Sequence, residues 1–124
     1  QVETHQSDIG ETINSMALEY SKSLQYLHEL LINSLEKHLS HQVNSTSFLG
    51  NGCNESSINW VNQYISKHSF SNFSPHITLG IGQFKGKFIP KESIAKRLAV
   101  CHLGNYCTCR EILFETQINN SKTK

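Results

Sequence analysis

The chain has few of the residues that cross-link or punctuate a fold, with four cysteines and two prolines among 124 residues. Four cysteines are too few for a disulfide scaffold of this length, so we expect free thiols. No apolar run approaches the roughly 20 residues that span a bilayer, which excludes a membrane helix. The polar start, residues 1–5, lacks the regions of a signal peptide. We therefore expect a cytoplasmic chain, unless a leader has been removed.

An excess of charge of one sign is also missing. Eleven basic and ten acidic residues give a net charge of +1, and the basic side chains gather only in one loose series, Lys85, Lys87, Lys91, Lys96 and Arg97. This balance excludes a strong nucleic-acid or membrane-surface footprint and remains compatible with a small anionic substrate. The length predicts a single domain with its own core.

The most informative stretch is Ser74–Gly80, with the sequence SPHITLG. Pro75 restricts the residue before it to extended backbone, and the branched residues that follow favour a strand beginning near position 75. Strand alternation then predicts a polar face with His76, Thr78 and Gly80, and an apolar face that needs a core, with Ile77, Leu79 and Ile81.

His76 and Thr78 combine an acid–base group with a hydroxyl. Two residues of strand rise place them roughly 6–7 Å apart on the same face, where a phosphate oxygen could bridge them. His-x-Thr is a short pattern, and on spacing alone it is more typical of an ordinary half-buried histidine followed by a good strand residue. The spacing alone therefore leaves both interpretations open.

Before this stretch, the pattern predicts a strand near 13–20 and a helix over 22–39, capped by Ser21 or Ser23. A helical stripe that starts at Ile13 is the competing interpretation. A second amphipathic helix is predicted over 57–67. Its cap is expected at Ser56 or Ser57, and the other segments are expected to be irregular: the loops 40–56 and 83–90, a helical turn from Pro90, and a disordered tail over 119–124.

The last predicted element is a hairpin, with Leu98–Leu103 and Tyr106–Phe114 joined by the pair Gly104–Asn105 in a type II′ turn. A two-residue turn pairs position 103 with 106, 102 with 107 and 100 with 109. It puts three of the four zinc-type ligands of this region on one face, His102, Cys107 and Cys109, and Cys101 on the other. Three ligands do not close a structural zinc site, so we expect no metal.

In this order of elements, Phe73–Gly80 (FSPHITLG) resembles the second signature of the 2H phosphoesterases, a family that includes 2′-5′ RNA ligase-like proteins. Three further stretches are similar to the same family: Met16–Tyr20 with the segment Leu27–Leu31, Ile58–Ile65, and Ala99–Thr108. The resemblance covers most of residues 13–115.

The resemblance implies an α+β fold with antiparallel sheets and flanking helices, built as two similar lobes around a cleft. Each lobe would contribute one His-x-Thr/Ser signature. It also implies a metal-independent phosphodiesterase without a cofactor, acting on a 2′,3′-cyclic or 2′-5′ phosphodiester of a small nucleotide or an RNA end. His76 would be one acid–base catalyst, because imidazole titrates near neutrality. Thr78 would hold a non-bridging phosphate oxygen.

The family's first signature has one counterpart here, His5-Gln6-Ser7, which we interpret as a turn because it lacks apolar neighbours. We therefore expect the chain to be the C-terminal part of a 2H-like domain, ordered over about 12–116, with its first lobe incomplete. An upstream segment or a homo-oligomer would supply the second histidine. Two hypotheses of other classes stay open: a catalytically incomplete module that binds a nucleotide or RNA end, and a small structural domain.

Overall fold

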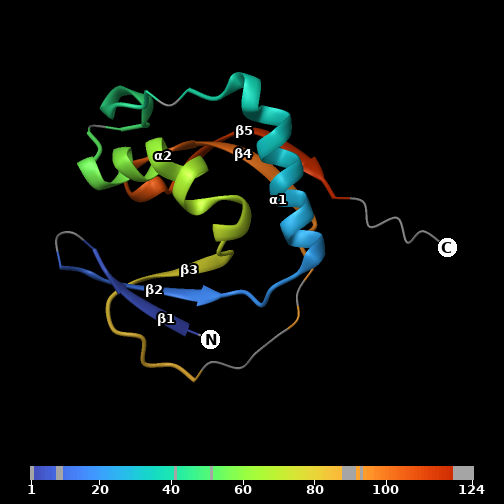
Figure 1. The fold of residues 1–124 in the computed structure, drawn as a ribbon. Helices are drawn as coiled ribbons and strands as arrows, with labels where there is room; N and C mark the ends of the chain where they lie inside the picture. Colours follow the sequence, from blue (N-terminus) through green and yellow to red (C-terminus); the bar gives the residue numbers. More distant parts are fainter. Residues whose placement is uncertain are drawn as a thin grey trace. The chain divides into compact units, whose positions relative to one another are not determined.

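The computed structural model describes residues 2–7, 10–40, 42–50, 52–87, 92 and 94–118. The described chain is α+β, with antiparallel strands and two α-helices (Figure 1). It forms two compact units, one within Gln1–His41 and Gln63–Pro90 and the other within Gln42–Asn62 and Lys91–Lys124. The helical turn expected at Pro90 and the tail over 119–124 lie outside the described residues.

The first unit holds a three-stranded antiparallel sheet in the order β1-β2-β3. Its strands are β1 (Val2–Gln6), β2 (Thr12–Ala17) and β3 (His76–Ile81). The strands predicted near 75 and near 13 are confirmed, although β2 ends at Ala17. The interpretation of His5 and Gln6 as part of a turn is wrong, because both pair with β2. Backbone pairing outweighs their polar composition, since strand propensity depends strongly on context.

A β-bulge interrupts the pairing of β2 with β3. Ser15 lies opposite Thr78, and Asn14, the residue before Ser15, lies opposite Gly80. Leu79 is therefore an extra residue in β3. Gly80 has a φ of +136°, a conformation that favours glycine. The bulge shifts the alternation: Gly80 leaves the face of Thr78, and the prediction that they share a face is wrong.

The apolar face predicted for β3 is not buried. Ile77 and Leu79 are each 44% exposed and Ile81 is 63% exposed. Ile81 lies opposite Ile13, which shares the face of Ser15 and therefore of Thr78. The three apolar residues of β3 consequently do not form one face against a core.

Both predicted helices are present. Helix α1 (Lys22–Leu35) is capped by the Ser21 hydroxyl, which accepts a hydrogen bond from the Leu24 amide, and a 3-10 turn follows over Glu36–His38. Helix α2 (Glu55–His68) begins earlier than predicted. Its cap is Asn54, whose Oδ1 accepts from the Ser57 amide at 2.8 Å, so the predicted caps within 56–57 are wrong. Asparagine caps as well as serine does, and it is the residue before the first turn.

The interior of the first unit contains His28 of α1, which is 7% exposed. Its Nε2 accepts a hydrogen bond from the Phe70 amide at 3.0 Å, and its ring stacks on Phe73 with centroids 3.9 Å apart. Gln25 donates to the Phe70 carbonyl at 2.9 Å. Phe70 has a φ of +52°, so two side chains of α1 hold both backbone groups of a strained residue. This contact fixes the segment that leads into β3.

The second unit contains the predicted hairpin, formed by β4 (Arg97–Leu103) and β5 (Cys109–Gln117). The predicted two-residue turn is wrong, because Leu103 pairs with Cys109 and the loop covers 104–108. Hydrogen bonds from outside the hairpin support the wider loop. The Asn54 amide donates to Asn105 Oδ1 and the Tyr106 amide donates to the Ser57 hydroxyl, both at 3.0 Å.

Few apolar side chains are buried in either unit. Among the described residues only Phe48, at 6% exposed, counts as a buried apolar side chain. The hairpin carries four apolar residues that are more than half exposed, Val100, Ile112, Leu113 and Phe114. The buried polar residues are Asn14, Ser15, His28, Ser57 and Ser69. Polar residues therefore outnumber apolar ones among the buried side chains of the described chain.

Candidate functional site

His76 and Thr78 lie on one face of β3, where both side chains are exposed. His76 pairs with Ala17 and Thr78 with Ser15, so the two residues occupy the regular part of the strand before the bulge. The Leu18 amide donates to the Pro75 carbonyl at 3.0 Å and extends the ladder to the residue before His76. His76 and Thr78 are therefore neighbours on one exposed face of β3, as the two-residue spacing predicts.

The ring of His76 is oriented by the backbone just before it. Its Nδ1 lies 3.0 Å from the Ser74 carbonyl oxygen. A carbonyl can only accept, so Nδ1 carries the hydrogen and Nε2 holds the lone pair of the neutral ring. This arrangement leaves Nε2 to accept a proton from a bound molecule. The sequence signal for it is Pro75, which extends the backbone at Ser74.

The register row through Thr78 brings a carboxylate to the same face. Glu3 of β1 lies opposite Ser15, and Ser15 lies opposite Thr78. Two strand spacings put the Glu3 backbone about 10 Å from that of Thr78. The carboxylate of Glu3 lies 3.7 Å from His5 Nε2. The row of Glu3, Ser15 and Thr78 contains no basic side chain. Binding of an anion beside Thr78 would therefore rely on the Thr78 hydroxyl and on the protonated form of His76.

His5, the other candidate histidine, shares this face but lies at the far end of the sheet. It pairs with Ile13, four rows along β2 from Ala17, the partner of His76. Four rows and two strand spacings correspond to about 16 Å between the two backbones. One phosphate group cannot contact both rings at that separation. Within this sheet, His5 and His76 do not form an acid–base pair.

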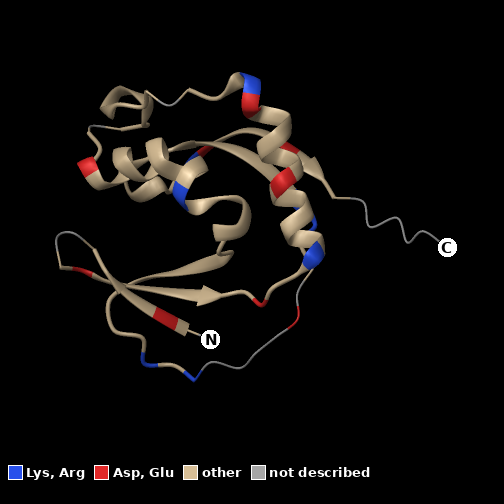
Figure 2. Ribbon diagram, in the orientation of Figure 1, with Lys and Arg blue, Asp and Glu red and all other residues tan. Residues whose placement is uncertain are grey.

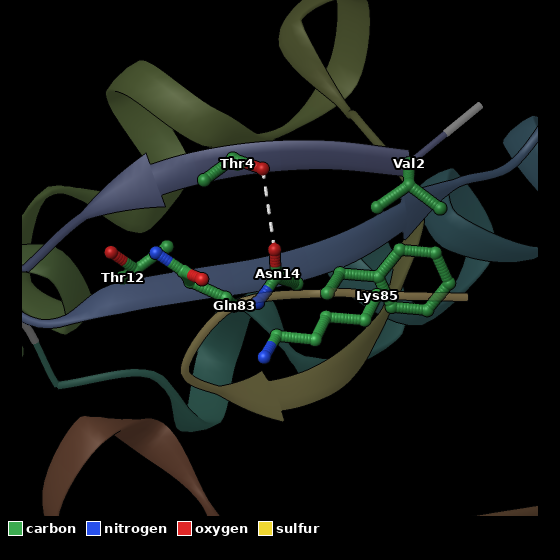
Figure 3. A pocket seen from close by; sticks show the side chains of 7 residues that line it. Val2, Thr4, Thr12, Asn14, Gln83 and Lys85 are labelled. Carbon is green, nitrogen blue, oxygen red and sulfur yellow. Dashed lines mark hydrogen bonds between the residues drawn. The ribbon is translucent and has the colours of Figure 1, made fainter. Parts of the chain in front are cut away.

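A shallow hollow of about 430 Å³ lies on the opposite face of the same sheet (Figure 3). Asn14 lies on its floor, donates to the Gly82 carbonyl and accepts from the Thr4 hydroxyl at 3.2 Å. No sequence motif pointed to this face of the sheet, apart from the basic series that includes Lys85. Its lining is Val2, Thr4, Thr12, Asn14, Gln83, Phe84 and Lys85. Because Asn14 and Ser15 are neighbours in β2, the hollow and Thr78 are on opposite faces.

The cysteines do not follow the predicted arrangement. Cys101 and Cys109 were expected on opposite faces, yet the strand register puts them on the same face. The five-residue loop is the reason, since it pairs Cys109 with Leu103, which shares the face of Cys101. In the part of the chain that the structure describes, no group of three or more His, Cys, Asp or Glu side chains could hold a metal ion.

The charged side chains and the helices add two observations. Lys and Arg of the described residues are spread over several elements and do not gather on one (Figure 2). Within the described ranges, no helix has the length and apolar character needed to cross a membrane.

When the chain is compared with models of known families, with curated proteins and with solved structures, it matches none of them.

Proposed function

We propose that this chain carries one half of the active site of a metal-independent phosphodiesterase of the 2H type, acting on a 2′,3′-cyclic or 2′-5′ nucleotide or RNA phosphodiester. The observation that carries this proposal is the exposed pair His76 and Thr78 on one face of β3, with the His76 ring oriented through Ser74. The resemblance of Phe73–Gly80 to the family signature supports the same assignment. The two-lobed architecture of the family is part of the proposal.

In this mechanism Nε2 of His76 takes the proton of the attacking water while the water oxygen bonds to phosphorus. The bond to the leaving ribose oxygen breaks, and a second acid protonates that oxygen. Thr78 donates its hydroxyl hydrogen to a non-bridging oxygen, which gains negative charge in the transition state. In the reverse assignment His76 is the acid. Its Nε2 is then protonated beforehand and gives the proton to the leaving oxygen, while Nδ1 keeps its hydrogen bond to the Ser74 carbonyl. An upstream lobe or a second copy of the chain supplies the other group.

The test measures hydrolysis of 2′,3′-cyclic nucleotides by the complete protein. His76→Ala should lower kcat by about 10²–10⁴-fold, the usual contribution of a general acid or base. Thr78→Val should lower it by about 10²-fold, as expected for the loss of one donor to the phosphate oxygens. His38→Ala is the matched control, because it removes an exposed histidine that lies outside this sheet. Undiminished hydrolysis by His76→Ala would disprove the proposal.

The second candidate is a module that binds a nucleotide or RNA end without turnover. The separation of His5 from His76 favours it, since the described residues offer no second histidine close to His76 on this sheet. Titration with a 3′-mononucleotide, followed by NMR, distinguishes the two. Binding that requires Thr78, with no product after long incubation of the complete protein, supports the module. If neither Thr78→Val nor His76→Ala changes the affinity for the nucleotide, both candidate functions are contradicted.

A further inference from the structure

Two cysteines face each other beside the loop of the β4–β5 hairpin. Cys109 begins β5 and pairs with Leu103, and Cys101 lies two residues before Leu103 on β4. Residues two apart on a strand share a face, so the cysteines are diagonal neighbours across the ladder. Arg110, the next residue, is an extra residue in β5, where the register shifts. Cys109 also raises the pKa of the Cys101 thiol, as expected for two thiols near each other.

We propose that Cys101 and Cys109 are a reversible disulfide site, oxidised by exchange with a low-molecular-weight disulfide such as oxidised glutathione. The bond would join the two strands across the loop 104–108. A disulfide needs the sulfurs at about 2.05 Å and the Cα atoms within about 7 Å. Diagonal neighbours on a ladder lie about 7–8 Å apart, just beyond that range, so closure needs a small backbone movement. The bulge and the loop next to Cys109 are where the backbone can take up the remaining movement.

The exchange is balanced without oxygen or a metal. The thiolate of Cys109, which is the exposed member of the pair, attacks one sulfur of glutathione disulfide and releases one glutathione. The thiolate of Cys101 then attacks the Cys109 sulfur of this mixed disulfide and releases the second glutathione. Two protein thiols and one small disulfide thus become one protein disulfide and two small thiols.

The state of Cys109 affects the order of the two steps. In the reduced pair the hydrogen bond with Cys109, desolvation and the charge of Cys109 raise the pKa of the Cys101 thiol, which disfavours Cys101 as the first nucleophile. Once Cys109 is in the mixed disulfide, both effects of Cys109 are gone. Closure still needs the thiolate of Cys101, so it should become faster as the pH rises. The variant Cys101→Ser would stop the reaction at the mixed disulfide.

The other two cysteines have a different environment. Burial raises the pKa of the Cys107 thiol, and the nearby Cys53 raises it further. The bonds from Asn54 to Asn105 and from Tyr106 to Ser57 keep the loop of Cys107 beside the segment of Cys53. Neither Cys53 nor Cys107 is as exposed as Cys109, so exchange should begin at Cys109, which faces Cys101. We therefore expect Cys107 to stay reduced while the pair across the hairpin closes.

Mass spectrometry distinguishes the pairings. The full chain is equilibrated with oxidised and reduced glutathione at about pH 8, where exchange is fast; free thiols are then blocked with N-ethylmaleimide. Trypsin leaves three cysteines, Cys101, Cys107 and Cys109, on the single peptide 98–110. This peptide should be lighter by two hydrogens and carry one label. Chymotryptic cleavage after Tyr106 should then give two fragments held together by the disulfide, with the label on Cys107; a label on Cys109 would pair Cys101 with Cys107 and overturn the proposal.

Variants and alternative products complete the test. Cys53→Ser should leave the product unchanged, whereas Cys101→Ser should give glutathione on Cys109 and no internal bond. Three labels on peptide 98–110 would overturn the proposal. So would a cross-link from that peptide to peptide 38–67, which contains Cys53, or a bond contained in one fragment after cleavage at Tyr106, which would pair Cys107 with Cys109.

Discussion

The contact between His28 and Phe70 allows a stability prediction that separates two interactions of one ring. His28→Phe keeps an aromatic ring that can stack on Phe73 but removes the acceptor for the Phe70 amide. An unsatisfied, partly buried N–H costs about 1–3 kcal/mol. His28→Ala loses the stacking and the packing as well, and truncating a buried ring costs about 3–5 kcal/mol. The alanine variant should therefore be the less stable of the two.

The same contact makes stability depend on pH. Burial lowers the pKa of His28 from its usual 6.5, and the charge of Glu29 opposes this only in part. As the pH falls below about 6.5, the unfolded chain binds a proton at this position before the folded chain does. The contribution of neutral His28 is therefore present above 6.5 and is lost as the pH falls through the lowered value. Protonation of Nε2 would also remove the hydrogen bond from Phe70.

Urea unfolding followed by circular dichroism, at about pH 7.5 and about pH 5.5, measures both effects. The wild type should lose more stability between the two values than His28→Phe, because other groups titrate equally in both proteins. Amide hydrogen exchange at Phe70 should become faster in the variant. If His28→Phe matches the wild type in stability, in pH dependence and in exchange at Phe70, the hydrogen bond has no energetic role.

Four further predictions concern the cap, the bulge, the three-stranded sheet and the hairpin. Asn54→Ala should cost about 1 kcal/mol and reduce helical circular dichroism, because it removes the cap of α2; a gain in helicity would contradict this. Gly80→Ala should cost about 1–3 kcal/mol in urea unfolding, through its positive φ and not through a clash. An unchanged midpoint would mean a different backbone there. Asn14→Leu should cost about 1–3 kcal/mol per hydrogen bond lost, whereas Arg97→Ala, in an exposed ion pair, should cost less than about 1 kcal/mol.

The elements that local residues determine could be predicted from the sequence. Pro75 and the branched residues after it indicated β3, and Ser21 gave α1 its start. The pair His76 and Thr78 was predictable because two-residue spacing keeps one face whenever the strand is regular, and the bulge comes only after Thr78. The orientation of the His76 ring could not be predicted from the sequence, because it depends on where the backbone places the Ser74 carbonyl.

The sequence-based predictions fail where the local structure is not determined by the local residues. The bulge at Leu79 moves Gly80 and Ile81 to faces that strict alternation does not give, and nothing in HITLGI distinguishes a glycine of a bulge from one of a regular strand. Gly104–Asn105 has the residues of a tight turn. The wider loop forms because groups near the start of α2, about fifty positions earlier, bond to it. Local turn chemistry is a weak guide when such bonds compete with it.

The β4–β5 hairpin also has a consequence for how the protein behaves in solution. Apart from the Leu49 amide, which bonds to the Leu103 carbonyl at 2.7 Å, the two strands pair among the described residues only with each other. Their outer edges therefore offer a row of backbone donors and acceptors beside exposed side chains such as Phe114. A strand from another molecule can extend such an edge, in a step that is second order in protein. We expect dilution, more than cooling, to keep the chain monomeric.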